Sequence, residues 1–310
     1  MFTPLLTRCR SCLRQIFRAA LLLSLIAPAL AADPVRLVAT IKPLQLIAQA
    51  VAGDTLAVEL LIDPRQSHHD YHLRPSDRAR LARADLVLWV GPSLEGFLTR
   101  TMRSLTPATR VVMLGPELPA PAHQEHGTRH HHHHGELAQD GHIWLDPARA
   151  VAMARQIAAE LSVLMPEQRL QWQHNSERFA EAMAELDKEF AEQFQALEQP
   201  RSYLVMHDAY GHFERHYGLQ RTATYSATPE QQPGVRHFSA LAQAIDAGRI
   251  GCVFSEPQYR AAALERLVRE RSDIRVVELD LMAGAQTVEP DGFVRFYASF
   301  AQAFLSCLRQ

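Results

Sequence analysis

Short apolar runs alternate with segments of helical periodicity along most of the chain, and this alternation constrains the fold more than any other feature. The pattern is typical of βαβ units, in which helices cover a sheet of parallel strands. It therefore predicts an α/β protein with mainly parallel sheets. The expected strands are 35–41, 56–62, 85–90 and 111–114 in the first half and 203–206, 222–225, 252–255 and 276–279 in the second.

A long helical segment separates the two sets of predicted strands. From Pro147 the pattern is helical almost throughout, and its only break is Pro166, a residue that fits the first turn of a new helix. The piece that begins at Pro166 would be about 45 Å long at 1.5 Å per residue, longer than one small domain needs. The expected organisation is an N-terminal lobe at 32–165, a rigid connecting helix at 166–198 and a C-terminal lobe at 199–310.

The first 31 residues have the pattern of a secretory signal peptide. Arginines form a basic beginning, an apolar run follows at 19–29, and Ala29-Leu30-Ala31 is a typical cleavage site. The run is shorter than the ~20 apolar residues of a membrane span, and no cysteine follows the cleavage site as in a bacterial lipoprotein. We therefore expect a soluble protein exported to the periplasm.

Removal of this leader takes away four arginines and no acidic residue, so the formal net charge falls from −2 to −6. A mildly acidic chain is not expected to bind nucleic acid. Two cysteines remain, Cys252 at the start of a predicted strand and Cys307 at the end of the final helical segment, 292–307. An even pair in an oxidising compartment predicts one disulfide, which would tie the C-terminus to the second lobe. The alternative is two buried free thiols.

Histidine is the residue type that points to a function, with 16 in 310 residues. A segment rich in Pro, Gly and His at 115–140 lacks apolar periodicity, which predicts a flexible surface loop. Such a loop would bind several metal ions weakly, or it would serve as a neutral spacer. Its histidines are His123, His126, His130, His131, His132, His133 and His134.

Three other histidines occupy places where ligands of α/β proteins bind. His69 follows the second predicted strand, His142 lies where the loop rejoins the fold, and His207 directly follows the strand 203–206. Ligands bind beyond the carboxyl ends of parallel strands, so these side chains are expected to converge. Asp280, directly after the last strand, is a fourth candidate. Three imidazoles with a carboxylate or water suit Zn²⁺, whereas Mn²⁺ prefers more oxygen ligands.

The remaining histidines have ordinary interpretations. His212 and His216 are four residues apart on a predicted helix, with Glu214 between them, and we expect them to form a pair on the helix surface. The zinc-protease pattern H-E-x-x-H needs a glutamate adjacent to the first histidine, so it is not present here.

Five motifs along the chain belong together. Ser-His-His-Asp-Tyr-His-Leu-Arg-Pro-Ser-Asp at 67–77 is followed by Ala-Asp-Leu-Val-Leu-Trp-Val-Gly-Pro at 84–92. Then come His-Ile-Trp-Leu-Asp-Pro at 142–147, His-Asp-Ala-Tyr-Gly at 207–211 and Phe-Ser-Glu-Pro-Gln at 254–258. In this combination the chain resembles the periplasmic zinc-binding proteins of high-affinity zinc uptake systems, the ZnuA type of bacterial metal-binding solute-binding protein.

The resemblance implies two lobes joined by a long helix, with the metal in the cleft between the lobes. It makes His69, His142 and His207 the zinc ligands. Asp280 matches an acidic position that manganese-binding relatives use, and His68 stands where some relatives have glutamate near the metal. The fourth ligand is therefore Asp280, His68 or water. The histidine-rich insertion and both remaining cysteines also fall at the family's usual places.

The implied function is high-affinity capture of Zn²⁺ in the periplasm and its delivery to an inner-membrane ABC permease with its ATPase subunit. We expect a monomer that is not an enzyme, and release of the metal through rearrangement of loops. One alternative is a manganese-binding solute-binding protein. Another is a zinc-dependent hydrolase, for which Glu256 and Asp208 are the nearby acids that would serve as base. A third is a surface adhesin or metal buffer.

Overall fold

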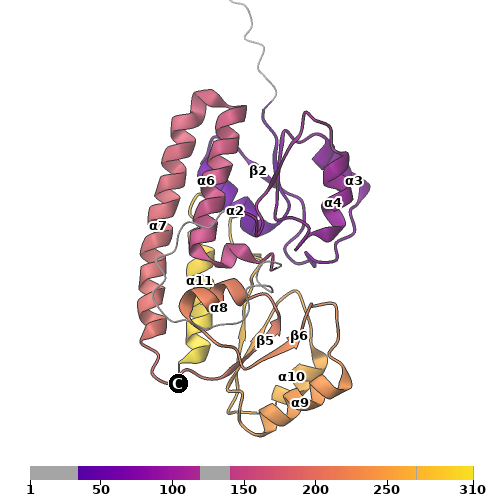
Figure 1. Ribbon diagram of the computed structural model, residues 1–310, viewed down its shortest axis with the longest axis vertical. Helices are drawn as coiled ribbons and strands as arrows, with labels where there is room; N and C mark the ends of the chain where they lie inside the picture. The colour runs from indigo at the N-terminus through magenta and orange to yellow at the C-terminus, as the bar shows by residue number, and fades with distance from the viewer. Residues whose placement is uncertain (1–33, 119–139, 270, 310) are drawn as a thin grey trace, which may run out of the picture. The chain divides into compact units, whose positions relative to one another are not determined.

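Two four-stranded parallel sheets form the framework of the protein (Figure 1). The computed structural model describes residues 34–118, 140–269 and 271–309. No helix in these three ranges is long and apolar enough to cross a membrane. The predicted signal peptide lies outside the described residues.

The first sheet has the strand order β2-β1-β3-β4. Its central strands β1 and β3 are completely buried, as expected when helices cover both faces of a parallel sheet. The strands are β1 (Leu37–Ala39), β2 (Val58–Leu60), β3 (Leu86–Trp89) and β4 (Arg110–Met113). The helices that connect them are α2 (Lys42–Ala52), α3 (Pro75–Ala82), the 3-10 helix η1 (Gly96–Leu98) and α4 (Thr99–Ser104).

Helix α3 fixes the segment that follows His68 and His69. Pro75 occupies the first turn of the helix, where its missing N–H costs nothing. The carboxylate of Asp77 accepts hydrogen bonds from the backbone N–H of Arg74 at 2.9 Å and from the hydroxyl of Tyr71 at 2.8 Å. The chain between His69 and α3 is therefore tied to the start of this helix.

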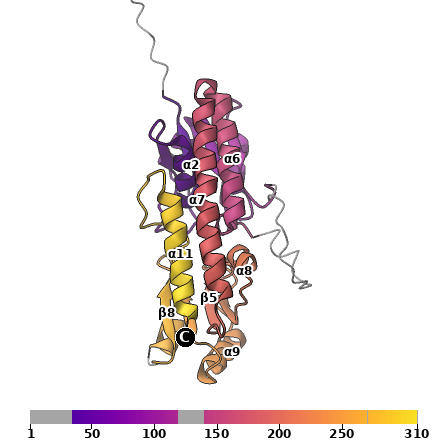
Figure 2. The ribbon, with the colours of Figure 1, turned by 90° about the vertical axis from the view of Figure 1, so that its left-hand side faces the viewer.

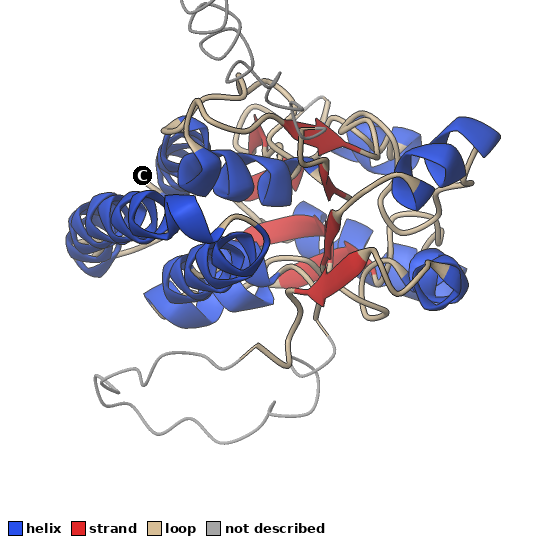
Figure 3. Cartoon of the chain, turned by 90° about the horizontal axis from the view of Figure 1, so that it is seen from above, coloured by secondary structure: helices blue, strands red, loops and turns tan. Residues whose placement is uncertain are grey.

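The second sheet repeats the arrangement with the order β6-β5-β7-β8, again with parallel pairs. Its strands are β5 (Tyr203–His207), β6 (Ala223–Ser226), β7 (Cys252–Ser255) and β8 (Arg275–Glu278). Helices α8 (Gly211–Tyr217), α9 (Val235–Asp246) and α10 (Ala262–Val268) connect them. Figure 3 shows helices on both sides of the strands. The predicted α/β class with two parallel-sheet lobes is confirmed.

Long helices join the two halves. After the 3-10 helix η2 (Ile143–Leu145), α6 (Pro147–Leu164), the 3-10 turn η3 (Pro166–Gln168) and α7 (Arg169–Gln195) form an antiparallel pair. With 27 residues, α7 is about 40 Å long. It packs against α2 from the first half and against α8 from the second.

The C-terminal helix α11 (Gly292–Leu308) runs beside α7 (Figure 2). The rings of Phe179 on α7 and Phe293 on α11 lie 5.7 Å apart, and a Cβ at Gly292 would meet Leu46 of α2 at 3.0 Å. At its other end, α11 is joined to β7 by the Cys252–Cys307 disulfide, which confirms that prediction. Helix α11 therefore contacts α2, α7 and the second sheet together.

Candidate metal centre

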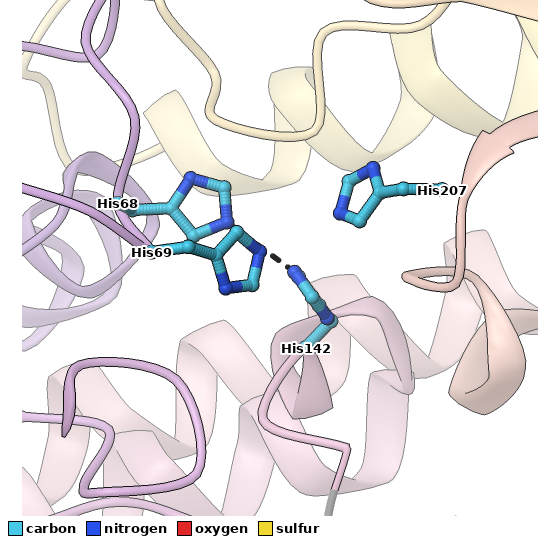
Figure 4. Close-up of side chains that lie close together, drawn as sticks. All are labelled: His68, His69, His142 and His207. Atoms are coloured by element: carbon cyan, nitrogen blue, oxygen red, sulfur yellow. Dashed lines mark hydrogen bonds between the residues drawn. The ribbon is translucent and has the colours of Figure 1, made fainter. Parts of the chain in front are cut away.

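Four histidines from distant parts of the chain converge, and their rings face a common space (Figure 4). His68 and His69 lie on the loop between β2 and α3, His142 directly precedes η2, and His207 is the last residue of β5. One nitrogen of each ring lies within 4.8 Å of the others. Within the described ranges, this is the one group of three or more His, Cys, Asp or Glu side chains that could hold a metal ion. The structure thus brings together the three predicted histidines and His68, one of the candidates for the fourth position.

Two of the rings are oriented by carboxylates. Nδ1 of His142 lies 2.8 Å from Asp140 Oδ1, and Nδ1 of His207 lies 2.8 Å from Glu256 Oε1. A carboxylate accepts hydrogen bonds, so Nδ1 carries the proton in both rings and Nε2 presents a free lone pair. This is the usual arrangement behind a metal-binding histidine. Glu256 also accepts the Tyr210 hydroxyl at 2.9 Å, which fixes the carboxylate itself.

The distance between two of the nitrogens matches an edge of a tetrahedral zinc site. His68 Nε2 and His142 Nε2 are 3.3 Å apart, the contact drawn as a dashed line in Figure 4. Zinc–imidazole bonds of 2.0–2.1 Å give a tetrahedron with an edge of about 3.3 Å. Nε2 of His69 and Nε2 of His207 are buried without a hydrogen-bond partner among the described residues. Buried polar atoms normally have a partner, and a shared metal ion would provide one for both.

Burial keeps three of the rings, those of His68, His69 and His142, in the form that binds metals. It lowers the pKa of His68 and of His142 well below the ordinary value, with the neighbouring histidines adding to the effect. It lowers the pKa of His69 to about 4. A histidine ligand must be neutral, so at neutral pH no proton has to leave these three rings when a metal binds.

The loop that carries His68 and His69 is shaped by a serine hydroxyl. Ser67 Oγ accepts the backbone N–H groups of His69 and Asp70, both at 3.2 Å. This local turn holds two consecutive residues in irregular backbone so that both rings reach the same site.

The turn at 90–95 supports the backbone next to His142. A Cβ at Gly141 would lie 2.7 Å from Leu94 Cβ, so this close approach requires glycine. The turn itself is held by Glu95, whose Oε2 accepts the Val90 N–H at 2.8 Å. Glu95 is completely buried, and desolvation raises its pKa to about 7.

Asp280 does not belong to the group of side chains that converge on the candidate metal site. Its carboxylate accepts Gln258 Nε2 at 2.9 Å and the backbone N–H groups of Met282 and Gly284 at 3.2 and 2.6 Å. These donors hold it in the turn that follows β8. Its role as a ligand stays a prediction without support from this arrangement.

The other predicted residues have different outcomes. The prediction that His212 and His216 form a surface pair is wrong, because their side chains are only 3% and 15% exposed. His212 Nε2 donates to the backbone oxygen of Asp140, and His216 Nε2 donates to Asp187. Asp208 is half exposed and pairs with Arg221. The loop histidines His123, His126 and His130 to His134 lie outside the described residues.

Sequence reasoning missed Asp140, and it named Glu256 only as the base of a hydrolase and not as the partner of His207. Asp140 ends the histidine-rich segment, where no periodicity marks a structural role. Glu256 directly follows β7, the strand beside β5, so the same rule that selected His207 would also have selected Glu256 as its neighbour.

Comparison with known proteins agrees with this geometry. Residues 37–307 match the family model ZnuA, described as zinc-uptake complex component A, periplasmic. A protein of Yersinia pestis named high-affinity zinc uptake system protein ZnuA is 33% identical over 292 residues, which cover 88% of this chain and 91% of the relative. A protein of the same name from Haemophilus ducreyi is 30% identical over 290 residues, which cover 87% and 92%.

Solved structures share the fold. A crystal structure of ZnuA matches with a TM-score of 0.71 at 23% identity, over 89% of this chain and 99% of that chain. A Zn(II)-bound variant of AdcAII from Streptococcus pneumoniae matches with a TM-score of 0.73 at 20% identity, over 89% and 99%. From the match over residues 37–307 and the two relatives, this chain belongs to the ZnuA family of periplasmic zinc-uptake components.

Proposed function

We propose that this protein captures one Zn²⁺ ion in the periplasm and delivers it to an inner-membrane ABC permease with its ATPase subunit. The observation that carries the proposal is the group of four converging imidazoles, two of them held by carboxylates with Nε2 free. The family of the chain and the signal-peptide pattern of residues 1–31 support the compartment and the transport role.

The proposed ligands are His69, His142 and His207, with His68 in the fourth position in place of Asp280 or water. The 3.3 Å between His68 Nε2 and His142 Nε2 supports this choice. Four nitrogen donors in a tetrahedron suit Zn²⁺, whereas Mn²⁺ prefers oxygen ligands and a higher coordination number. The same donor set therefore makes a manganese carrier the weaker alternative.

A hydrolase receives little support from the site. Catalytic zinc keeps one coordination position open for water or substrate, and four imidazoles would close it. Glu256, a candidate base, is already hydrogen-bonded to His207 and Tyr210. Asp208 is engaged with Arg221. We therefore propose a binding protein and not an enzyme.

The test is a competitive titration of the apo protein without residues 1–31, with Zn²⁺ and Mn²⁺ against a calibrated chelator. Wild type and the control His174→Ala, which changes an exposed histidine of α7, should bind zinc tightly and manganese weakly. The double variant His69→Ala/His207→Ala should lose tight zinc binding. Zinc affinity that is equal in all three proteins would refute the proposal.

The fourth ligand needs a separate measurement. Cobalt-loaded wild type should show the intense visible absorption of a tetrahedral site, and X-ray absorption of the zinc form should count four imidazoles. In His68→Ala the count should fall to three, with zinc affinity lowered about tenfold or more. Four imidazoles in that variant would show that His68 is not a ligand.

A further inference from the structure

The turn that follows β7 contacts both halves of the metal centre. We propose that Gln258 and Tyr259 of this turn, together with Glu230, form a clasp that holds the 63–70 loop in its metal-binding position. The clasp residues are positioning residues, and they set the rate at which the bound ion leaves. The inference rests on the proposed function, because it assumes that His68 and His69 of that loop bind the cargo.

Three hydrogen bonds run from the second half of the chain to the 63–70 loop. Gln258 Nε2 donates to the backbone oxygen of Pro64 at 3.0 Å, and the Tyr259 hydroxyl donates to Ser67 Oγ at 3.3 Å. The Ser67 hydroxyl in turn donates to Glu230 Oε1 at 2.5 Å. Residues more than 160 positions apart in sequence are thus joined directly beside the metal-binding rings.

Ser67 connects the clasp to the ligands. Its one hydroxyl proton goes to Glu230. The Tyr259 hydroxyl and the backbone N–H groups of His69 and Asp70 all lie within hydrogen-bond distance of its oxygen and share the two lone pairs. The hydroxyl is therefore fully used, and any displacement of Tyr259 or Glu230 reaches the backbone of His69 through a single atom.

The same turn also fixes the ligand on the opposite side. Glu256 orients His207 through Nδ1, and the Tyr259 ring lies edge-on to the His207 ring with centroids 5.9 Å apart. The backbone N–H of Tyr259 donates to the backbone oxygen of Glu256 at 3.2 Å, so residues 256–259 form one tight turn. One short turn therefore holds His207 and the loop of His68 and His69 at a fixed separation.

This arrangement assigns the movement needed for release to the loop. Helices α7 and α11 both pack against α2 and against elements of the second half, which opposes a rotation of one sheet relative to the other. The 63–70 loop contains no helix or strand, and the three hydrogen bonds of the clasp connect it to the second half. Breaking them would free two ligands without unfolding a helix or strand.

The experiment measures zinc release by stopped flow, in which zinc-loaded protein is mixed with excess chelator. In Gln258→Ala/Tyr259→Phe the release rate should rise about 10- to 30-fold, since two hydrogen bonds to the 63–70 loop are lost. The variant also loses the bond from Gln258 to Asp280, which does not involve the loop. The association rate should change less than about twofold, because mutations at an interface act mainly on dissociation. The cobalt absorption spectrum should be unchanged, because all four imidazoles remain.

The matched control is Tyr225→Phe. It removes a hydroxyl whose hydrogen bond is also 3.3 Å long but runs to Gln232 within the second half. It should leave the release rate unchanged, and its thermal stability shows what loss of such a hydroxyl costs the fold. Glu230→Ala is a second test at an exposed position where misfolding is not expected, and it should raise the release rate about threefold to tenfold.

The outcomes separate the clasp from the proposed function. If wild type does not bind zinc tightly, the proposed function fails and the clasp fails with it. If wild type binds tightly but the clasp variants release zinc as slowly as Tyr225→Phe, only the clasp is overturned. A changed cobalt spectrum in the clasp variants would also overturn it, since the residues would then alter the ligand set and not the position of the loop.

Discussion

Replacing Glu95 with glutamine should stabilise the apo protein above pH 7 and have little effect near pH 4.5. Desolvation raises the pKa of this buried carboxyl from an ordinary value of 4.5 to about 7. Because the pKa is higher in the folded state, the folded protein binds the proton more tightly than the unfolded chain. The stability that this protonation contributes is fully present below pH 4.5 and is lost as the pH rises from 4.5 through 7. A shift of this size corresponds to a cost of about 3 kcal/mol once the carboxyl is ionised in both states.

Glutamine removes that cost and retains a carbonyl oxygen for the Val90 N–H. The assay is urea unfolding of the metal-free protein at intervals from pH 4 to pH 9, with Glu59→Gln as the control at an exposed position of β2. The difference in unfolding free energy between Glu95→Gln and wild type should grow from near zero at pH 4.5 to about 3 kcal/mol at pH 8. A difference that does not vary with pH, or a wild type that is the more stable protein at pH 8, would refute the reasoning.

Three further predictions concern the metal centre and the disulfide. Asp140→Asn should weaken zinc binding about 10- to 100-fold in the competitive titration, because the His142 ring loses its charged partner. Zinc affinity should be nearly constant between pH 6 and pH 8 and fall below about pH 5, because burial lowers the pKa of His69 to about 4 and lowers the pKa of His68 and His142 well below the ordinary value. The double variant Cys252→Ala/Cys307→Ala should lose about 4 kcal/mol of unfolding free energy in urea, since the disulfide closes a loop with a sequence separation of 55.

Each of these three predictions has an outcome that would contradict it. An Asp140→Asn variant with wild-type affinity would mean that Asp140 does not position His142. Affinity that falls steeply already between pH 7 and pH 6 would show that the rings titrate as ordinary histidines. Cysteine variants as stable as wild type would mean that the rest of α11 is enough to hold the C-terminus.

The sheets could be predicted because their signal is local. Apolar runs such as Leu86–Trp89 and Tyr203–His207 are buried on both faces, so they stand out from the helical segments around them. The three main histidines could be predicted for the same reason, since each follows a strand or marks the return to regular structure. The rule about strand ends then brings them together without knowledge of any contact.

The sequence could not show which of His68 and Asp280 lies beside the other three histidines. The outcome depends on side-chain partners in irregular backbone, where periodicity carries no information. Ser67 turns the loop so that His68 faces the site, while Met282 and Gly284 supply backbone donors that engage Asp280.

The sequence likewise did not show that the side chains of His212 and His216 are largely buried. His212 contacts Asp140, which is 72 residues away, and His216 contacts Asp187, which is 29 residues away. Helical spacing reveals which residues share a helix face, but not what packs against that face.

The two carboxylates behind the ligands have a consequence for charge balance. In the proposed site, four neutral imidazole ligands would contribute no charge, and the carboxylates of Asp140 and Glu256 would match the two positive charges of Zn²⁺. Both carboxylates are largely buried, and burial raises the pKa of Asp140. The proposed cargo would thus complete the electrostatics of its own carrier, and a recipient that offers negative charge would favour its transfer.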